Sequence, residues 1–196
     1  FGANSAIFKE LNQNAYHNEK VMVENQDAFI ALENDSQFYD LIIIDFPDPR
    51  SIELSRLYTL ELYSFCKKRL RMGGIIITQA TSPYFQAKSF YCINKTMRAA
   101  GLNTLPIHNH VQSFGEWGWI IGSKLYSESQ MEIKLSSYDS LPIKNTRWLT
   151  TDALKMMSKF GKAVGDTSNL EINSIHNPVL FKYYIKGTEF NQSFYE

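Results

Sequence analysis

The segment YDLIIIDFPDP, residues 39–49, decides the fold class of this sequence. Its run of leucine and isoleucine between Asp40 and Asp45 is typical of a strand buried on both faces, as in a parallel sheet covered by helices. Pro47 and Pro49 then end regular structure, because proline cannot donate a backbone hydrogen bond. A carboxylate directly after a buried strand is a candidate functional group, so Asp45 and its loop are the first candidate site.

Helices and strands alternate on both sides of this segment. Before it, the residue patterns predict a helix over 3–13, a short strand over 21–23 and a helix over 25–33. After it, they predict a helix over 57–70 ended by Gly73-Gly74, a strand over 75–79, a helix over 86–100 ended by Gly101, and strands over 103–110 and 117–123. This order predicts an α/β fold with a doubly wound, Rossmann-like sheet.

The last third of the chain is less regular. We expect residues 1–124 to form the main domain and 125–196 to be a C-terminal extension packed on it. Within the extension the patterns predict loops over 139–150 and 161–169, a helix over 152–160, and a final helix that starts at Asn177-Pro178 and ends at Gly187.

The charge balance excludes some classes of partner. The 196 residues carry 20 Lys+Arg and 20 Asp+Glu, and this formal net charge of zero argues against a general binder of nucleic acid or anionic membranes. The balance is uneven along the chain: residues 1–50 carry three bases and nine acids, and residues 51–100 carry eight bases and two acids. Such asymmetry occurs both in binding surfaces and in solvated helix faces.

The compartment follows from cysteines and from apolar runs. Cys66 and Cys92 are too few for a disulfide scaffold, so reduced thiols in the cytoplasm are expected. No apolar run approaches the length of about 20 residues that crosses a bilayer, and no signal peptide pattern is present. The chain begins with Phe1 rather than methionine, and we therefore expect it to be part of a longer product.

The polar residues predicted at the carboxyl ends of strands are the candidate site, because ligands bind there in open α/β sheets. They include Asp27, Asp45, Asp48, Gln79 and Glu116. Four carboxylates at one sheet edge repel one another when the site is empty, and a cationic ligand relieves that cost. Several have structural alternatives: Asp27 suits a helix N-cap, and Gln79 suits an ordinary surface loop.

Other kinds of chemistry find little support in the sequence. His108 and His110 share a strand face, but two histidines without a third ligand make a weak metal site, and no metal is expected. The aromatic stretch FGEWGW, residues 114–119, is either a hairpin whose rings fill the core or part of the site. No serine triad, nucleophile elbow or phosphate-binding loop is present.

Several segments of the sequence resemble a known family. YDLIIIDFPDP followed by LYTLELYSFCKKRLRMGGIIITQATSP is similar to a block of the spermidine/spermine synthase family, the polyamine aminopropyltransferases. That family typically shows D-x-x-D-P, then L-[FY]-[ST]-x-E-[FL]-Y, a Gly-Gly turn and a strand ending in Thr-Gln. NQDAF at 25–29 resembles its adenine-side motif, and HVQSFGEWGWIIGSK with LEINSIHNPVLFKYY resembles a branch with membrane-embedded N-terminal regions.

The resemblance implies a fold, a reaction and residue roles. The fold would be an S-adenosylmethionine-dependent methyltransferase-type sheet, here without its first strands. The reaction would move an aminopropyl group from decarboxylated S-adenosylmethionine, a co-substrate, to a polyamine such as putrescine, giving spermidine without a prosthetic group or metal. Asp45 would be the general base; Asp27, Ala28 and Asp45 would hold the donor, whereas Asp48, Gln79 and Glu116 would hold the polyamine.

The sequence also departs from the family pattern. Arg50 follows the acidic motif where Gly-Pro-Ala is usual, and Val111-Gln112 replaces the usual Tyr-Pro. The family's glycine-rich donor loop has no counterpart in this sequence, so we expect the chain alone to be incomplete. We expect it to form a homo-oligomer or to depend on further chain. Any membrane anchor would lie in an absent N-terminal region. A methyltransferase that uses S-adenosylmethionine and a non-catalytic binding module remain alternatives.

Overall fold

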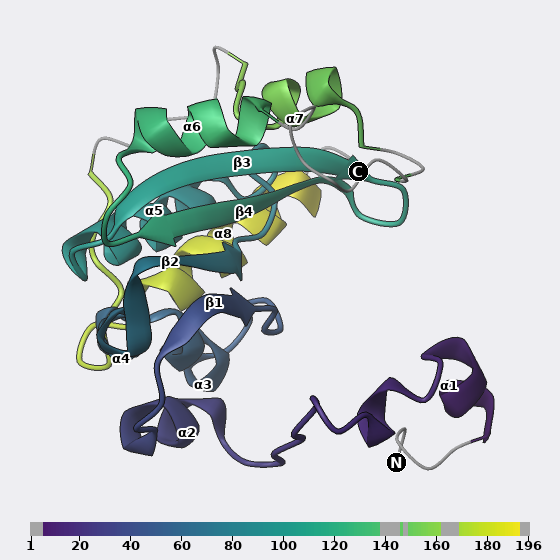
Figure 1. Cartoon of the computed structure of the whole chain (residues 1–196). Helices are drawn as coiled ribbons and strands as arrows, with labels where there is room; N and C mark the ends of the chain where they lie inside the picture. Colours follow the sequence, from purple (N-terminus) through teal and green to yellow (C-terminus); the bar gives the residue numbers. More distant parts are fainter. Residues whose placement is uncertain (1–5, 138–145, 147–148, 162–168, 193–196) are drawn as a thin grey trace.

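A four-stranded mixed sheet forms the centre of the protein (Figure 1). The computed structural model describes residues 6–137, 146, 149–161 and 169–192. The strands lie in the order β1-β2-β4-β3, with β1 at Tyr39–Ile44, β2 at Leu70–Gln79, β3 at Asn103–Val111 and β4 at Gly115–Ser123. β1 and β2 are parallel, whereas β4 is antiparallel to both of its neighbours. The expected mixture of helices and strands is therefore present.

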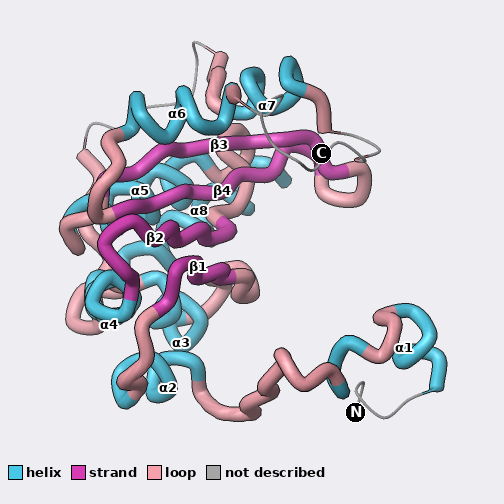
Figure 2. Tube along the Cα trace, viewed as in Figure 1, coloured by secondary structure: helices cyan, strands magenta, loops and turns pink. Residues whose placement is uncertain are grey.

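Helices cover the two faces of this sheet (Figures 1 and 2). The α-helices are α1 Ala6–Leu11, α2 Ala28–Asn34, α3 Ile52–Ser55, α4 Leu60–Arg69, α5 Ala87–Ala99, α6 Glu128–Ser136, α7 Thr151–Met157 and α8 Val179–Gln192, with 3-10 turns at Ala15–His17 and Arg56–Tyr58. On one face, Leu105 and Ile107 of β3 pack with Met131 of α6. On the other, Ile76 and Ile120 pack within the larger core that α4, α5 and the start of α8 contribute to.

Strand β1 is less covered than its sequence predicts. Ile44 is buried, but Leu41 is 54% exposed and Ile43 is 69% exposed, so the expectation of burial on both faces is wrong. Ile42 and Ile44 belong to the main core, whereas Leu41 and Ile43 lie on the other face of the strand and remain exposed. The apolar run therefore predicts the strand correctly, but its prediction that both faces of the strand are buried is wrong.

The segment before α2 also differs from expectation. Val21, Met22 and Val23 are exposed and belong to no strand among the described residues. A strand needs a neighbour to bond its backbone groups, and this stretch runs extended beside none (Figure 1). Helix α1 lies apart from the sheet at the far end of that stretch (Figure 1). The predicted helices over 3–13 and 25–33 thus appear as the shorter α1 and α2.

Glycines mark two places where the chain behaves differently. Gly101 follows α5 with φ of 82°, as its predicted role in ending that helix requires. Gly73 and Gly74, in contrast, do not end α4, which stops at Arg69; they lie inside β2. A Cβ at Gly74 would lie 3.0 Å from the carbonyl oxygen of Asp40 in β1, so glycine there permits close approach of the two strands.

The last third of the chain is more helical than predicted. α6 was not anticipated, and α7 corresponds to the predicted helix over 152–160. Most of the predicted loops over 139–150 and 161–169 lies outside the described residues. α8 continues past Gly187 to Gln192, so Gly187 does not end it. The end of the Gln86 side chain lies where a Cβ of Gly187 would be.

A fully buried asparagine joins this part of the chain to the rest. The Asn173 side-chain amide nitrogen donates to the carbonyl oxygens of Ser55 (2.9 Å) and Tyr58 (3.1 Å). Its oxygen accepts from the Ser55 hydroxyl and from the backbone N–H of Leu180 in α8, both at 3.2 Å. The start of α8 is therefore fixed to the segment that precedes α4. Division of the chain at residue 124 remains a prediction.

Within the described residues, no helix is both long enough and apolar enough to cross a lipid bilayer.

Candidate active site at the acidic loop

The loop after β1, residues 45–50, carries the two predicted site carboxylates and is held by buried side chains. The Tyr58 hydroxyl donates to the carbonyl oxygens of Phe46 (2.9 Å) and Pro47 (3.1 Å). The Gln79 amide nitrogen donates to the Phe46 carbonyl oxygen (2.8 Å) and to the Tyr58 hydroxyl oxygen. Because Tyr58 and Gln79 are almost fully buried, the loop has a rigid support.

The pKa of Tyr58 is shifted by its burial and by its neighbours. Burial raises the pKa of Tyr58 far above its ordinary value, the Gln79 amide opposes that rise, and the charges of Asp48 and Asp45 add to it. Tyr58 therefore keeps its proton and acts as a donor to the loop carbonyls at any physiological pH. The Phe46 ring contacts the Tyr58 ring edge-on, with centroids 6.3 Å apart.

The two carboxylates of the loop differ in their bonding. Asp48 is half-buried, its Oδ1 lies 3.4 Å from the Gln79 amide nitrogen, and its Oδ2 accepts from the Tyr184 hydroxyl at 2.9 Å. Asp45 is exposed, and its side chain makes no hydrogen bond or ion pair with any residue that the structure describes. Asp48 is a fixed anion, whereas both oxygens of Asp45 remain available to a ligand.

A cavity of about 620 Å³ opens beside these groups. It is lined by the acidic loop, by neighbouring strand residues and by aromatic rings of the β3–β4 hairpin: Ile43, Ile44, Asp45, Phe46, Pro47, Asp48, Ile77, Gln79, Val111, Phe114, Trp117 and Trp119. The Phe114 and Trp117 rings pack 5.3 Å apart between centroids. A cavity with carboxylates beside apolar and aromatic side chains suits an organic cation. Ion pairs with the carboxylates and contacts with the faces of the aromatic rings would both stabilise the bound cation.

Two of the predicted donor residues, Asp27 and Ala28 at the start of α2, do not line this cavity. Asp27 is the N-cap of α2: its Oδ1 accepts from the backbone N–H groups of Phe29 (2.9 Å) and Ile30 (3.3 Å), and its Oδ2 pairs with Arg56 at 2.6 Å. The backbone N–H of Ile30, then that of Phe29 and the charge of Arg56, hold the pKa of Asp27 below its ordinary value. Ala28 is the first residue of the helix. Their donor-binding role remains a prediction.

Glu116 also lies outside the cavity, although the next residue, Trp117, lines it. Adjacent residues of a strand point to opposite faces, and Glu116 faces His108, whose Nδ1 lies 2.9 Å from Glu116 Oε2. The Glu116 Oε1 is 3.5 Å from Nδ1 of His110. Of the six predicted site residues, the structure thus brings together Asp45, Asp48 and Gln79; the polyamine-binding role of Glu116 stays a prediction.

No metal site accompanies these groups: the described part of the chain contains no cluster of three or more histidine, cysteine or acidic residues arranged to hold a metal ion.

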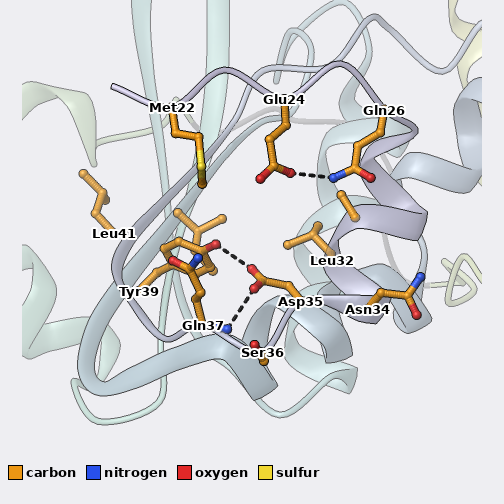
Figure 3. A pocket seen from close by; sticks show the side chains of 12 residues that line it. Met22, Glu24, Gln26, Leu32, Asn34, Asp35, Ser36, Gln37, Tyr39 and Leu41 are labelled. Carbon is orange, nitrogen blue, oxygen red and sulfur yellow. Dashed lines mark hydrogen bonds between the residues drawn. The ribbon is translucent and has the colours of Figure 1, made fainter. Parts of the chain in front are cut away.

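A second cavity, of about 670 Å³, lies between α2, β1 and the segment before α2 (Figure 3). Its polar groups bond to one another: the Tyr39 hydroxyl donates to Asp35 at 2.5 Å, and the Gln26 amide donates to Glu24 at 2.6 Å (Figure 3). The hydrogen bond to Tyr39 lowers the pKa of Asp35. None of the predicted site residues lines this cavity, so the acidic loop is the better candidate site.

Comparison with known proteins agrees with this geometry. The family model of the spermine/spermidine synthase domain matches residues 4–134, which include the acidic loop, Gln79 and the β3–β4 hairpin. The chain belongs to the spermine/spermidine synthase family. The resemblance inferred from the D-x-x-D-P segment is thereby confirmed.

Curated relatives in this family match most of the chain. The chain is 37% identical over 183 residues to a polyamine aminopropyltransferase of Oceanobacillus iheyensis, covering 92% of this chain and 34% of that protein. It is 34% identical over 178 residues to one of Leptospira interrogans, covering 91% of this chain and 34% of that protein. The chain therefore spans about a third of the length of these relatives.

Solved structures confirm the fold class. A spermidine synthase crystallised with the transition state analogue AdoDATO superposes with a TM-score of 0.64 at 16% identity, over 80% of this chain and 56% of that one. The spermidine synthase of Thermotoga maritima gives 0.59 at 14% identity, over 80% and 54%. The family member described here thus has the Rossmann-like, methyltransferase-type α/β fold that its sequence predicts.

Sequence reasoning missed two tyrosines that hold the acidic loop. Tyr58 stands in the family-like LYT segment at 57–59, and Tyr184 stands in the late VLFKYY stretch at 179–184; both segments were recognised without either tyrosine being singled out. The sequence contains a signal for Tyr58, because this residue directly precedes Thr59, the N-cap of α4. In an α/β fold the start of a helix lies near the end of the strand before it. For Tyr184, 136 residues from Asp48, no local signal exists.

Proposed function

We propose that this protein is an aminopropyltransferase, which moves the aminopropyl group of decarboxylated S-adenosylmethionine to a polyamine such as putrescine and so forms spermidine. The observation that carries the proposal is the pair of loop carboxylates beside an aromatic cavity: Asp48 is fixed by Tyr184, and Asp45 has no partner among the residues that the structure describes. The names of the curated relatives and the analogue bound to the related spermidine synthase agree with it.

The reaction needs a base and an alignment of two cations. A primary amine with a pKa of about 10 is protonated at neutral pH and must lose a proton before it attacks. We assign that proton to Asp45, whose oxygens have no partner in the described residues. The amine lone pair then attacks the methylene carbon bonded to the sulfonium, the carbon–sulfur bond breaks, and its electron pair neutralises the sulfur. Asp48 holds the amine in line, and the acids screen the repulsion between the two cations.

The remaining assignments are part of the proposal. Gln79 would line the polyamine site through its contact with Asp48, and Glu116 would bind polyamine only after a change in its contact with His108. Asp27 and Ala28 would face the adenine of the donor. No prosthetic group or metal is needed, because the sulfonium is itself the activated leaving group.

We also propose a setting for the reaction. Cys66 and Cys92 are free and buried, as expected in the reducing cytoplasm. The neutral net charge favours small-molecule substrates over nucleic acid. The exposed Leu41 and Ile43 on β1 favour association of copies, which light scattering on the purified protein tests directly.

A product assay tests the function. The protein at its full natural length is incubated with putrescine and decarboxylated S-adenosylmethionine, and products are identified by mass spectrometry; a parallel reaction contains S-adenosylmethionine. Spermidine in the first reaction supports the proposal. Methylated amine in the second with no spermidine in the first establishes a methyltransferase, and no product in either refutes an enzyme acting on these substrates.

Asp45→Asn tests the role of the base. We expect kcat to fall by a factor of about 10² to 10⁴, the usual contribution of a general base. Asp40→Asn is the matched control, because Asp40 is an exposed aspartate on β1, the strand that precedes Asp45, and it pairs with Arg71 away from the cavity. A loss of less than about tenfold in Asp45→Asn, outside that usual range, removes Asp45 from the mechanism.

A further inference from the structure

Asp48 is held by donors from two distant parts of the chain. Gln79 at the end of β2 approaches Oδ1 at 3.4 Å, and the hydroxyl of Tyr184 in α8 donates to Oδ2 at 2.9 Å. The second contact joins the acidic loop to a helix near the end of the chain. Nothing in the family-like block at residues 39–83 anticipates it.

The position of Tyr184 is fixed by the way α8 is anchored. The helix begins with Val179 and Leu180, which are buried in the main core, and the Leu180 backbone N–H donates to the buried Asn173. α8 then packs along α5 (Figure 1). Tyr184 lies one helical turn after these two residues, so its hydroxyl is held next to Asp48 with less conformational freedom than a surface side chain has.

The chemistry of this contact suits a binding carboxylate. Burial, and then the hydrogen bond to Asp48, raises the pKa of Tyr184 to about 12, so the hydroxyl keeps its proton and can only donate to the carboxylate. A neutral donor orients Asp48 without cancelling its charge, in contrast to a lysine or arginine that would compete with a cationic ligand. The negative charge therefore remains available to an ammonium group.

We propose that Tyr184 is a positioning residue for the amine acceptor, which acts through Asp48 and makes the C-terminal helix part of the acceptor site. The inference rests on the proposed aminopropyl transfer. In this proposal the contact between α8 and the acidic loop contributes to the affinity for the acceptor amine. It contributes neither to the affinity for the donor nor to the proton transfer at Asp45.

Kinetics of Tyr184→Phe test the proposal on the full-length protein. Loss of a hydrogen bond to a charged group is expected to raise KM for putrescine by about tenfold. KM for decarboxylated S-adenosylmethionine is expected to change less than about twofold, and kcat at saturating putrescine less than about threefold. Tyr183→Phe is the control: this neighbouring tyrosine accepts from the backbone of Glu171, 3.2 Å away, and lies outside the cavity. Its kinetics should equal the wild type.

A double-mutant cycle shows whether Tyr184 acts through Asp48. In an Asp48→Asn background, Tyr184→Phe should raise the putrescine KM by less than about twofold, because the partner is already altered. Equal effects in both backgrounds, an equal rise in donor KM, or a matching effect of Tyr183→Phe would overturn the proposal. Activity in the wild type with an unaffected Tyr184→Phe refutes this inference alone. An inactive wild type refutes the proposed function and the inference with it.

Discussion

Replacement of Asn173 by alanine is the sharpest test of how the last third of the chain supports the acidic loop. The Asn173 side chain is fully buried and makes four hydrogen bonds, to the Ser55 carbonyl, the Tyr58 carbonyl, the Ser55 hydroxyl and the Leu180 N–H. Alanine removes all four and leaves buried polar groups of Ser55, Tyr58 and Leu180 without these partners. A buried polar group without a partner lowers the free energy of unfolding by more than a typical hydrogen bond adds to it.

The magnitude follows from the number of bonds. At about 1 kcal/mol each, the four bonds amount to a loss of about 4 kcal/mol in the free energy of unfolding. That is a large share of the about 5–15 kcal/mol by which domains are stable. Asn173→Asp keeps the acceptor and the shape but points an oxygen at two carbonyl oxygens, so it should destabilise the protein at least as much at neutral pH.

Urea denaturation followed by circular dichroism measures the change. We expect Asn173→Ala to lower the midpoint at an unchanged denaturant slope. Asn177→Ala is the control, because the Asn177 side chain makes an exposed hydrogen bond to Glu171 and its loss should alter stability by at most about 0.5 kcal/mol. A loss below about 1 kcal/mol for Asn173→Ala, no more than a single net hydrogen bond, would refute the idea that this asparagine ties α8 to the segment before α4.

Three further predictions concern the core. Gly118→Ala should lower the free energy of unfolding by about 2 kcal/mol, as in other overpacked cores, because its Cβ would overlap the Phe90 ring and lie 3.0 Å from the Thr81 carbonyl oxygen; an unchanged urea midpoint would contradict it. Burial raises the pKa of Cys66 and of Cys92 to about 12 each, so alkylating reagents should label these thiols at neutral pH only after unfolding, as mass spectrometry can show. Stability should also fall as pH rises from 9 toward about 12, because unfolded thiols release protons there that the folded ones keep; constant stability across this range would contradict the pKa values.

Much of the fold could be predicted because local signals agree with the tertiary structure. The isoleucine run at 39–45 became β1, and Gly101 ends α5 with the positive φ that glycine allows. The prediction failed where an element depends on a partner distant in sequence. Val21–Val23 has strand-like residues but no neighbouring strand among those described, and Gly187 resembles a helix terminator but lies inside α8.

The candidate site divides in the same way. Asp45 and Asp48 could be found from the sequence because a buried strand followed by two prolines fixes them within one short loop. Gln79 could be found because neighbouring parallel strands end at the same sheet edge. Glu116 was expected beside them, but strand alternation turns it to the opposite face from Trp117. Tyr184 reaches Asp48 only through the packing of α8 on α5, which no sequence spacing encodes.

The manner in which the acidic loop is anchored has a consequence for engineering. Tyr58 and Gln79 bind the carbonyl oxygens of Phe46 and Pro47, and these oxygens are present whichever side chain occupies the position. The side chain at position 46, which lines the cavity, can therefore be varied without removing the bonds that hold the loop. Libraries directed at that position would explore amines of different length and bulk, whereas changes at Tyr58 or Gln79 would loosen the scaffold on which every such variant depends.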